Sequence, residues 1–170
     1  MIFKRAGAAA LLALALVAAA PAQAQFFQDN PDWRETEVPP PPAFDAKKLL
    51  AFEVSANPGM SYGVDPSTIV ISKNDSLVRY VVVATSKSGV SNAMYEALHC
   101  ATGEVKTYAR RTGLSEWQMA KNPQWHSVFD SAPSRHSLAF AKVGACDAKA
   151  PATSVRDLVD KLKTTRLFLD

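Results

Sequence analysis

Residues of the kinds that form recognisable catalytic motifs are scarce in this 170-residue sequence, which contains 7 glycines, 3 histidines and 2 cysteines. It lacks a glycine-rich phosphate loop, a Gly-x-Ser-x-Gly elbow, a Ser-x-x-Lys pair, a His-Glu-x-x-His helix and a calcium loop. His99, His126 and His136 are too widely spaced for a local metal motif, although a site assembled in three dimensions stays open. The sequence therefore predicts no cofactor and no metal, and it favours a non-enzymatic protein over an enzyme.

An excess of charge of one sign is lacking as well. The sequence has 19 basic and 16 acidic residues, and 17 basic residues remain when Lys4 and Arg5 are set aside as part of a leader. A nucleic-acid-binding protein needs a clustered basic face. The near balance of charge therefore predicts no nucleic-acid partner.

Long hydrophobic runs are confined to the N-terminus. Lys4 and Arg5 precede the apolar run Ala8–Ala20, and the small-x-small triplet Ala22-Gln23-Ala24 follows it, which is the order of a secretory signal peptide. As a helix the run spans roughly 20 Å, less than the hydrocarbon core of a bilayer. We therefore expect a signal peptide over residues 1–24, cleaved after Ala24, a periplasmic location and no transmembrane anchor in the mature protein. A leader that stays attached as an anchor is the alternative.

Prolines are concentrated directly after the leader. Residues 25–45 contain five of them, and Pro39–Pro42 are consecutive. Such a run favours an extended polyproline conformation and cannot lie in the centre of a sheet. We therefore expect a disordered, proline-rich tether over residues 25–45. Phe26, Phe27 and Trp33 are unusually apolar for a free tail, so they either dock on the domain or contact a partner.

Residues 46–170 have the pattern of a single α+β domain. Strands are expected over residues 48–54, 68–72, 77–86, 91–100, 104–111 and 137–143, with short helical segments at 115–120 and 125–129. Apolar residues on both faces of 77–86 place that strand at the centre of the sheet. Ser154 caps an amphipathic C-terminal helix. The predicted fold is one antiparallel β-sheet of about five or six strands packed against the C-terminal helix.

The two strands before and after Thr102-Gly103 are expected to form a hairpin. A two-residue loop would place Cys100 opposite Val105 and Leu98 opposite Thr107, and it separates apolar from polar side chains well. Glu96 then points inward with the apolar side chains. A three-residue loop with Gly103 in the left-handed conformation is the alternative, and it would mix the two faces.

A set of structural rather than catalytic motifs is spread over residues 44–166. Its members are Arg79-Tyr80, the stretch Ser91–Cys100 with Tyr95-Glu96 ahead of the cysteine, Lys106–Ala109, Trp117, Trp125, Cys146 and the closing helix. This set resembles the cryptic neisserial protein 1-like family. The resemblance implies a proteobacterial periplasmic protein, sometimes a lipoprotein, of uncharacterised function and with no catalytic residues to carry over. The leader contains no cysteine, so a lipid anchor is not expected here.

Cys100 and Cys146 both follow the leader and would reach an oxidising compartment. The first interpretation is a structural disulfide, which would contribute about 4 kcal/mol by closing a long loop. A redox pair is the second, although the Cys-x-x-Cys spacing is missing. A thiol nucleophile is the third, and it would need His126 or His136, because His99 and Cys100 point to opposite faces of a strand.

Glu96 is the most suggestive carboxylate, since an inward-facing carboxylate must be paired or protonated. Arg79 on the neighbouring strand is the expected partner. A pocket floor with a raised pKa and simple exposure are the alternatives. Tyr95, Trp117 and Trp125 complete the possible pocket, although core packing also explains the tryptophans together with Phe129.

These observations favour an exported periplasmic binding or accessory module of the cell envelope. Its partner would be an unidentified envelope protein or ligand. The first alternative is a small periplasmic hydrolase that uses Glu96 with a nearby histidine. The second is a structural protein of the envelope.

Overall fold

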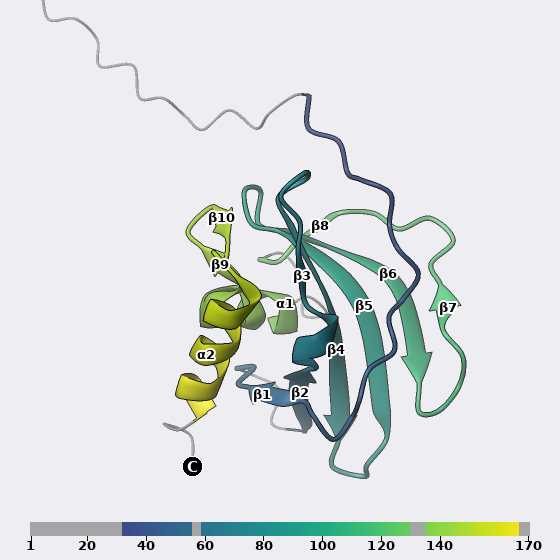
Figure 1. Cartoon of the computed structure of the whole chain (residues 1–170). Helices are drawn as coiled ribbons and strands as arrows, with labels where there is room; N and C mark the ends of the chain where they lie inside the picture. Colours follow the sequence, from purple (N-terminus) through teal and green to yellow (C-terminus); the bar gives the residue numbers. More distant parts are fainter. Residues whose placement is uncertain (1–31, 56–58, 130–134, 167–170) are drawn as a thin grey trace, which may run out of the picture.

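A computed structural model describes residues 32–55, 59–129 and 135–166 of the chain. One large antiparallel sheet forms the centre of the fold, with helices packed on one face, so the predicted α+β class is confirmed (Figure 1). The sheet strands are β1 (Leu50–Phe52), β2 (Met60–Val64), β3 (Val70–Ile71), β4 (Leu77–Ser86), β5 (Ser91–His99), β6 (Glu104–Thr112), β7 (Gln118–Met119) and β8 (His126–Ser127). The remaining elements are a 3-10 turn at Pro66–Thr68, α1 (Arg135–Phe140), a π-helical turn at Ala141–Ala145, the small β9 (Cys146–Asp147) and β10 (Ala150–Pro151) pair, and α2 (Val155–Arg166).

Strand β4 lies at the centre of the sheet. The main strand order is β1-β2-β4-β5-β6-β7, while β3 pairs with β4 and β8 pairs with β6. The eight residues from Leu77 to Ala84 are all buried, so both faces of the strand are covered, as its apolar sequence predicted. Its predicted bounds are confirmed as well.

The helix face of the sheet holds the larger part of the core. Leu158 and Leu162 of α2 and Phe140 of α1 pack with Val78, Tyr80 and Val82 of β4. The backbone N–H of Asp157 donates to Ser154 Oγ at 3.1 Å, which confirms the predicted cap of the C-terminal helix. The disulfide between Cys100 and Cys146 is also confirmed, with 5.6 Å between the two Cα atoms. It ties the end of the β5–β6 hairpin to the segment between the two helices.

The other face of the sheet is covered by the N-terminal segment, residues 32–45, which we call the strap. In Figure 1 the strap descends in purple along the sheet, on the side away from α1 and α2. Its side chains Trp33, Val38 and Phe44 pack against the apolar residues of this face. Residues 33–45 form neither helix nor strand. Trp33 thus docks on the domain, whereas Phe26 and Phe27 lie outside the described residues.

Three expected elements are wrong. Residues 115–120 and 125–129 contain the short edge strands β7 and β8 instead of helices, and residues 137–143 belong to α1 and the π-helical turn instead of a strand. Pairing with β6 decides the first two segments, which are too short for their own periodicity to be reliable. The third contains Leu, Ala and Lys, which favour a helix over a strand. Strand β2 was not expected.

The preferred register of the β5–β6 hairpin is also wrong. Leu98 lies opposite Val105 and His99 opposite Glu104, so that residues 100–103 form the turn. Gly103 has φ 69°, and its N–H donates to the carbonyl of His99 at 2.9 Å. The difference from the expected pairing is two residues, which leaves the inward direction of Glu96 and Leu98 unchanged. A bulge between Tyr95 and Glu96 then shifts the pairing further along the hairpin.

Candidate functional site

Glu96 lies at the centre of a buried polar cluster on the helix face, which we call the Glu96 cluster. Oε2 accepts from Tyr80 Oη at 3.1 Å and from Ser137 Oγ at 3.2 Å, and it lies 2.9 Å from His136 Nε2. Oε1 accepts from Thr107 Oγ1 at 3.0 Å. The expected pairing of Glu96 with Arg79 is therefore wrong. The two side chains belong to different faces of the sheet, and α1, which supplies the real partner, lies far along the chain.

The electrostatics of the Glu96 cluster favour a charged carboxylate. Burial pushes the pKa of Glu96 up, but the attraction of His136 and the surrounding hydrogen bonds outweigh it and leave the pKa lowered. Burial and the nearby Glu96 carboxylate raise the pKa of Tyr80 well above its usual range. The His136 ring stacks on Tyr62 with 5.6 Å between centroids. Both carboxylate oxygens of Glu96 have protein donors, so the cluster acts as a tie between the sheet and α1.

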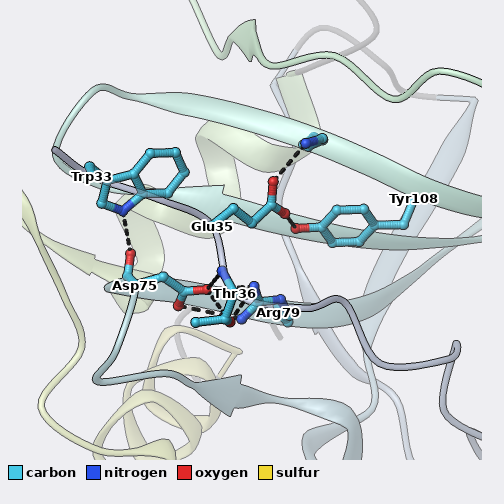
Figure 2. Close-up of polar contacts among 7 residues, drawn as sticks. Trp33, Glu35, Thr36, Asp75, Arg79 and Tyr108 are labelled. Carbon is cyan, nitrogen blue, oxygen red and sulfur yellow. Dashed lines mark hydrogen bonds and ion pairs between the residues drawn. The ribbon is translucent and has the colours of Figure 1, made fainter. Parts of the chain in front are cut away.

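The strap face carries a second buried ion pair. Arg79 Nη2 lies 2.6 Å from Asp75 Oδ2, and the two residues are 4% and 1% exposed. Thr36 of the strap donates to the same carboxylate oxygen, through its N–H at 3.0 Å and its hydroxyl at 2.6 Å. Trp33 Nε1 donates to the backbone carbonyl of Asp75 at 2.8 Å (Figure 2). Asp75 is thus the point at which the strap is fastened to the body of the sheet.

The chemical state of this pair is well defined. Burial would raise the pKa of Asp75, but hydrogen bonds from Arg79, Ser72 and Thr36 hold it far below its usual range. Ser76, the next residue, has φ 56°, a left-handed backbone conformation that residues other than glycine rarely adopt. Arg79 Nε has no hydrogen-bond partner among the described residues.

Glu35 supplies a third contact between the strap and the sheet. Its Oε2 lies 2.6 Å from Lys106 Nζ, and its Oε1 accepts a hydrogen bond from the Tyr108 hydroxyl (Figure 2). Burial raises the pKa of Tyr108, and the bonded Glu35 carboxylate raises it further. Lys106 Nζ also lies 5.3 Å from the centre of the Trp125 ring.

Aromatic rings flank these polar contacts. Trp33 stacks on His99 with 4.4 Å between centroids and meets Trp125 edge to face at 5.9 Å. Phe44 meets Trp117 edge to face at 6.1 Å, and the guanidinium of Arg111 lies 4.9 Å from the Phe44 ring centre. The strap is therefore held at one end by the Trp33 ring, which contacts His99 and Trp125, and at the other end by the Phe44 ring.

The residues expected to line one pocket divide between the two faces. Tyr95, Arg79, Trp117 and Trp125 belong to or border the strap face, whereas Glu96 lies on the helix face. Phe129, which was grouped with the tryptophans, is 70% exposed.

A family model described as the CNP1-like family matches residues 28–163. The chain belongs to the CNP1-like family. The matched range includes the strap as well as the sheet, α1 and most of α2, so the strap is part of the CNP1-like unit. Comparison with curated proteins found no match, and comparison with solved structures found none either.

In the part of the chain that the structure describes, no helix is long and apolar enough to cross a membrane. Over the same residues, no three side chains of His, Cys, Asp or Glu gather closely enough to hold a metal ion.

Sequence reasoning missed most of the polar residues of the strap face, namely Glu35, Thr36, Asp75, Lys106 and Tyr108. Two signals were available, namely Trp33, an apolar side chain in a proline-rich segment, and the motif Lys106–Ala109 of the family resemblance. Neither spacing nor composition marks Glu35 and Thr36, because their partners are 71 and 39 residues away in the chain.

Proposed function

We propose that this CNP1-like protein is an exported, non-enzymatic binding or accessory module of the bacterial cell envelope. The leader-like residues 1–24 support export. The Cys100–Cys146 disulfide supports an oxidising compartment such as the periplasm, because reducing systems keep most cytosolic thiols free.

The observation that carries a binding role is the way the strap face holds an extended segment. Trp33 stacks on His99, and Glu35 pairs with the cationic Lys106. The backbone N–H of Thr36 donates to the buried carboxylate of Asp75. Side-chain pockets of this kind give peptide-recognition surfaces their specificity. The face thus has the chemistry of a peptide-recognition surface.

The buried ionisable groups support a non-enzymatic role. The Glu96 cluster brings a carboxylate and His136 within 2.9 Å, as the hydrolase alternative requires. Glu96 and His136 are 1% and 5% exposed, and the carboxylate is shared among hydroxyl donors from two strands and a helix. A general base must reach a substrate proton, and these groups are committed to holding the fold.

Export can be tested by fractionating a Gram-negative host that expresses the full-length chain. We expect a periplasmic product that lacks residues 1–24 and whose two cysteines resist alkylation without reductant. Full-length chain with free thiols in the cytosol would contradict the proposal.

The binding role can be tested with a photo-reactive residue placed at Met119, which is 56% exposed on β7 beside the strap face. We expect a cross-link to a defined envelope component. The matched control places the same residue at Asp160, which is exposed on α2. Identical products from both positions, or none from either, would contradict a binding role for the strap face.

A further inference from the structure

The strap is bound to the sheet as a ligand would be. We propose that the strap face is a peptide-binding groove, that the strap fills it in the resting protein, and that its other occupant is an extended segment of a second exported protein. That segment would carry an aromatic side chain two residues before a carboxylate. This inference rests on the proposed function and names the partner that the binding module would take.

The sheet side of the groove is built without help from the strap. Arg79 lies in β4 between two paired strands, and its bond to Asp75 joins residues of the sheet body. Lys106 and Tyr108 lie on β6, and His99 ends β5. These side chains would therefore keep their places if the strap left, and a preformed site loses less conformational entropy on binding.

The strap itself is held mainly by side chains. It adds no strand to the sheet, and its prolines at 39–42 have no N–H to donate to a ladder. Pro39 and Pro40 are exposed. At the other end of the strap, the Asp45 N–H donates to Asp65 Oδ2 at 2.7 Å and Phe44 packs against Trp117, so neither end is held by a strand pairing. The end that carries Trp33, Glu35 and Thr36 can therefore detach while the strands stay paired, since local opening costs less than global unfolding where backbone bonds are few.

The strap also leaves a donor of the groove unused. Arg79 is 4% exposed, its Nη2 contacts Thr36 Oγ1 at 3.3 Å, and its Nε has no partner among the described residues. A buried unpaired donor is unfavourable. A ligand that presents a second acceptor at the place where the strap presents Thr36 would satisfy Nε and thereby compete with the strap.

The chemistry of the partner follows from the contacts that the strap makes. The slots that hold Trp33 and Glu35 are neighbours, because Trp125 contacts both the Trp33 ring and Lys106, the partner of Glu35. The first slot is aromatic, formed by His99 and Trp125, and the second is cationic, formed by Lys106. A segment with an aromatic residue followed at the second position by Asp or Glu matches both slots.

The test uses a fluorescent synthetic peptide with the sequence of residues 31–45 and the oxidised protein purified from the periplasm. We expect weak binding to the wild-type chain, because the strap fills the groove. Trp33→Ala in the protein should free the groove and tighten peptide binding at least tenfold, measured by fluorescence anisotropy. Glu35→Ala in the protein is a second variant that loosens the strap if the first fails to fold.

The matched controls change one partner at a time. The peptide with alanine in place of its tryptophan or its first glutamate should bind at least tenfold more weakly. Lys106→Ala, added to the Trp33→Ala protein, should remove the gain. Equal binding to wild-type and both loosened proteins, or equal binding of the intact and substituted peptides, would overturn the inference.

Two results separate this inference from the proposed function and from a second copy as occupant. A protein that is exported and cross-links through position 119 but does not bind the peptide in any variant would overturn the inference alone. A protein that stays in the cytosol but, once oxidised, binds the peptide would overturn export alone. A wild-type dimer that Trp33→Ala abolishes would identify the strap of a second copy as the occupant and overturn the assignment to another protein.

Discussion

Each face of the sheet buries a carboxylate, but the parts of the chain that cover and bind this carboxylate differ between the two faces. On the helix face, the partners of Glu96 come from β4, β6 and α1, and the nearby disulfide fixes the segment that follows α1. On the strap face, Asp75 shares its carboxylate between Arg79 of the sheet and Thr36 of a segment without secondary structure. The helix face is therefore sealed by the fold itself, whereas the strap face is sealed by a segment that can leave.

This difference assigns different tasks to the two faces. Strands and helices that are connected by such interactions unfold together, so these interactions contribute to global stability. Interactions between the strap and the sheet open locally and contribute mainly to the occupancy of the groove. Substitutions on the helix face should therefore change the free energy of unfolding, and substitutions on the strap should change peptide binding.

The largest effect is expected from removing the covalent tie of the helix face. Cys100→Ala combined with Cys146→Ala should lower the free energy of unfolding by about 4 kcal/mol, because the open chain gains entropy when unfolded. Urea denaturation measures this loss, and the wild-type protein with reductant should reproduce it. A loss below about 1 kcal/mol would mean that the disulfide contributes little to the global stability of the protein.

A somewhat smaller effect is expected from Glu96→Gln. The substitution removes the charge that His136 and the hydroxyl donors surround, and it should cost about 3 kcal/mol in urea denaturation. Glu104→Gln is the matched control on the same hairpin, since Glu104 is only half-buried, and it should cost less than about 0.5 kcal/mol. Equal losses of unfolding free energy in the two variants would show that the Glu96 cluster stabilises the fold no more than a half-buried glutamate does.

Acid should lower the free energy of unfolding, because one carboxylate on each face of the sheet, Glu96 and Asp75, loses its charge. The folded pKa values of Glu96 and Asp75 lie below their usual values of 4.5 and 3.8. The stability that each carboxylate contributes is therefore fully present above the unfolded pKa and is lost as the pH falls through the folded pKa. Urea midpoints should stay level from pH 7 to about pH 5 and fall below the unfolded pKa values. In Glu96→Gln the fall should be shallower, and an unchanged slope would contradict the lowered pKa of Glu96.

The sequence predicted the elements whose causes are local. The valine-rich run of β4, the Ser154 cap of α2 and the pairing of the two cysteines each follow from neighbouring residues or from the residue inventory. The partner of Glu96 could not be predicted in this way, because His136 is 40 residues away and lies in a helix that the sequence favoured as a strand. The strap likewise takes its position from side chains far along the chain, so its composition predicted extension and not the surface it covers.

The smallest effect concerns the backbone beside Asp75. Ser76 has φ 56°, which glycine adopts without strain, so Ser76→Gly should raise the free energy of unfolding by up to about 1 kcal/mol. Ser61→Gly in β2 is the matched control, and it should lower stability by about 0.5 to 1 kcal/mol because glycine gains more freedom in the unfolded chain. Both are measured by urea denaturation. The strained turn holds Asp75 at the point where Trp33 and Thr36 bind, so a gain in stability would locate strain at the fastening point of the strap. Equal losses in both variants would mean that the turn is as relaxed as the regular strands, and the contrast between the two faces would then depend on the strap contacts alone.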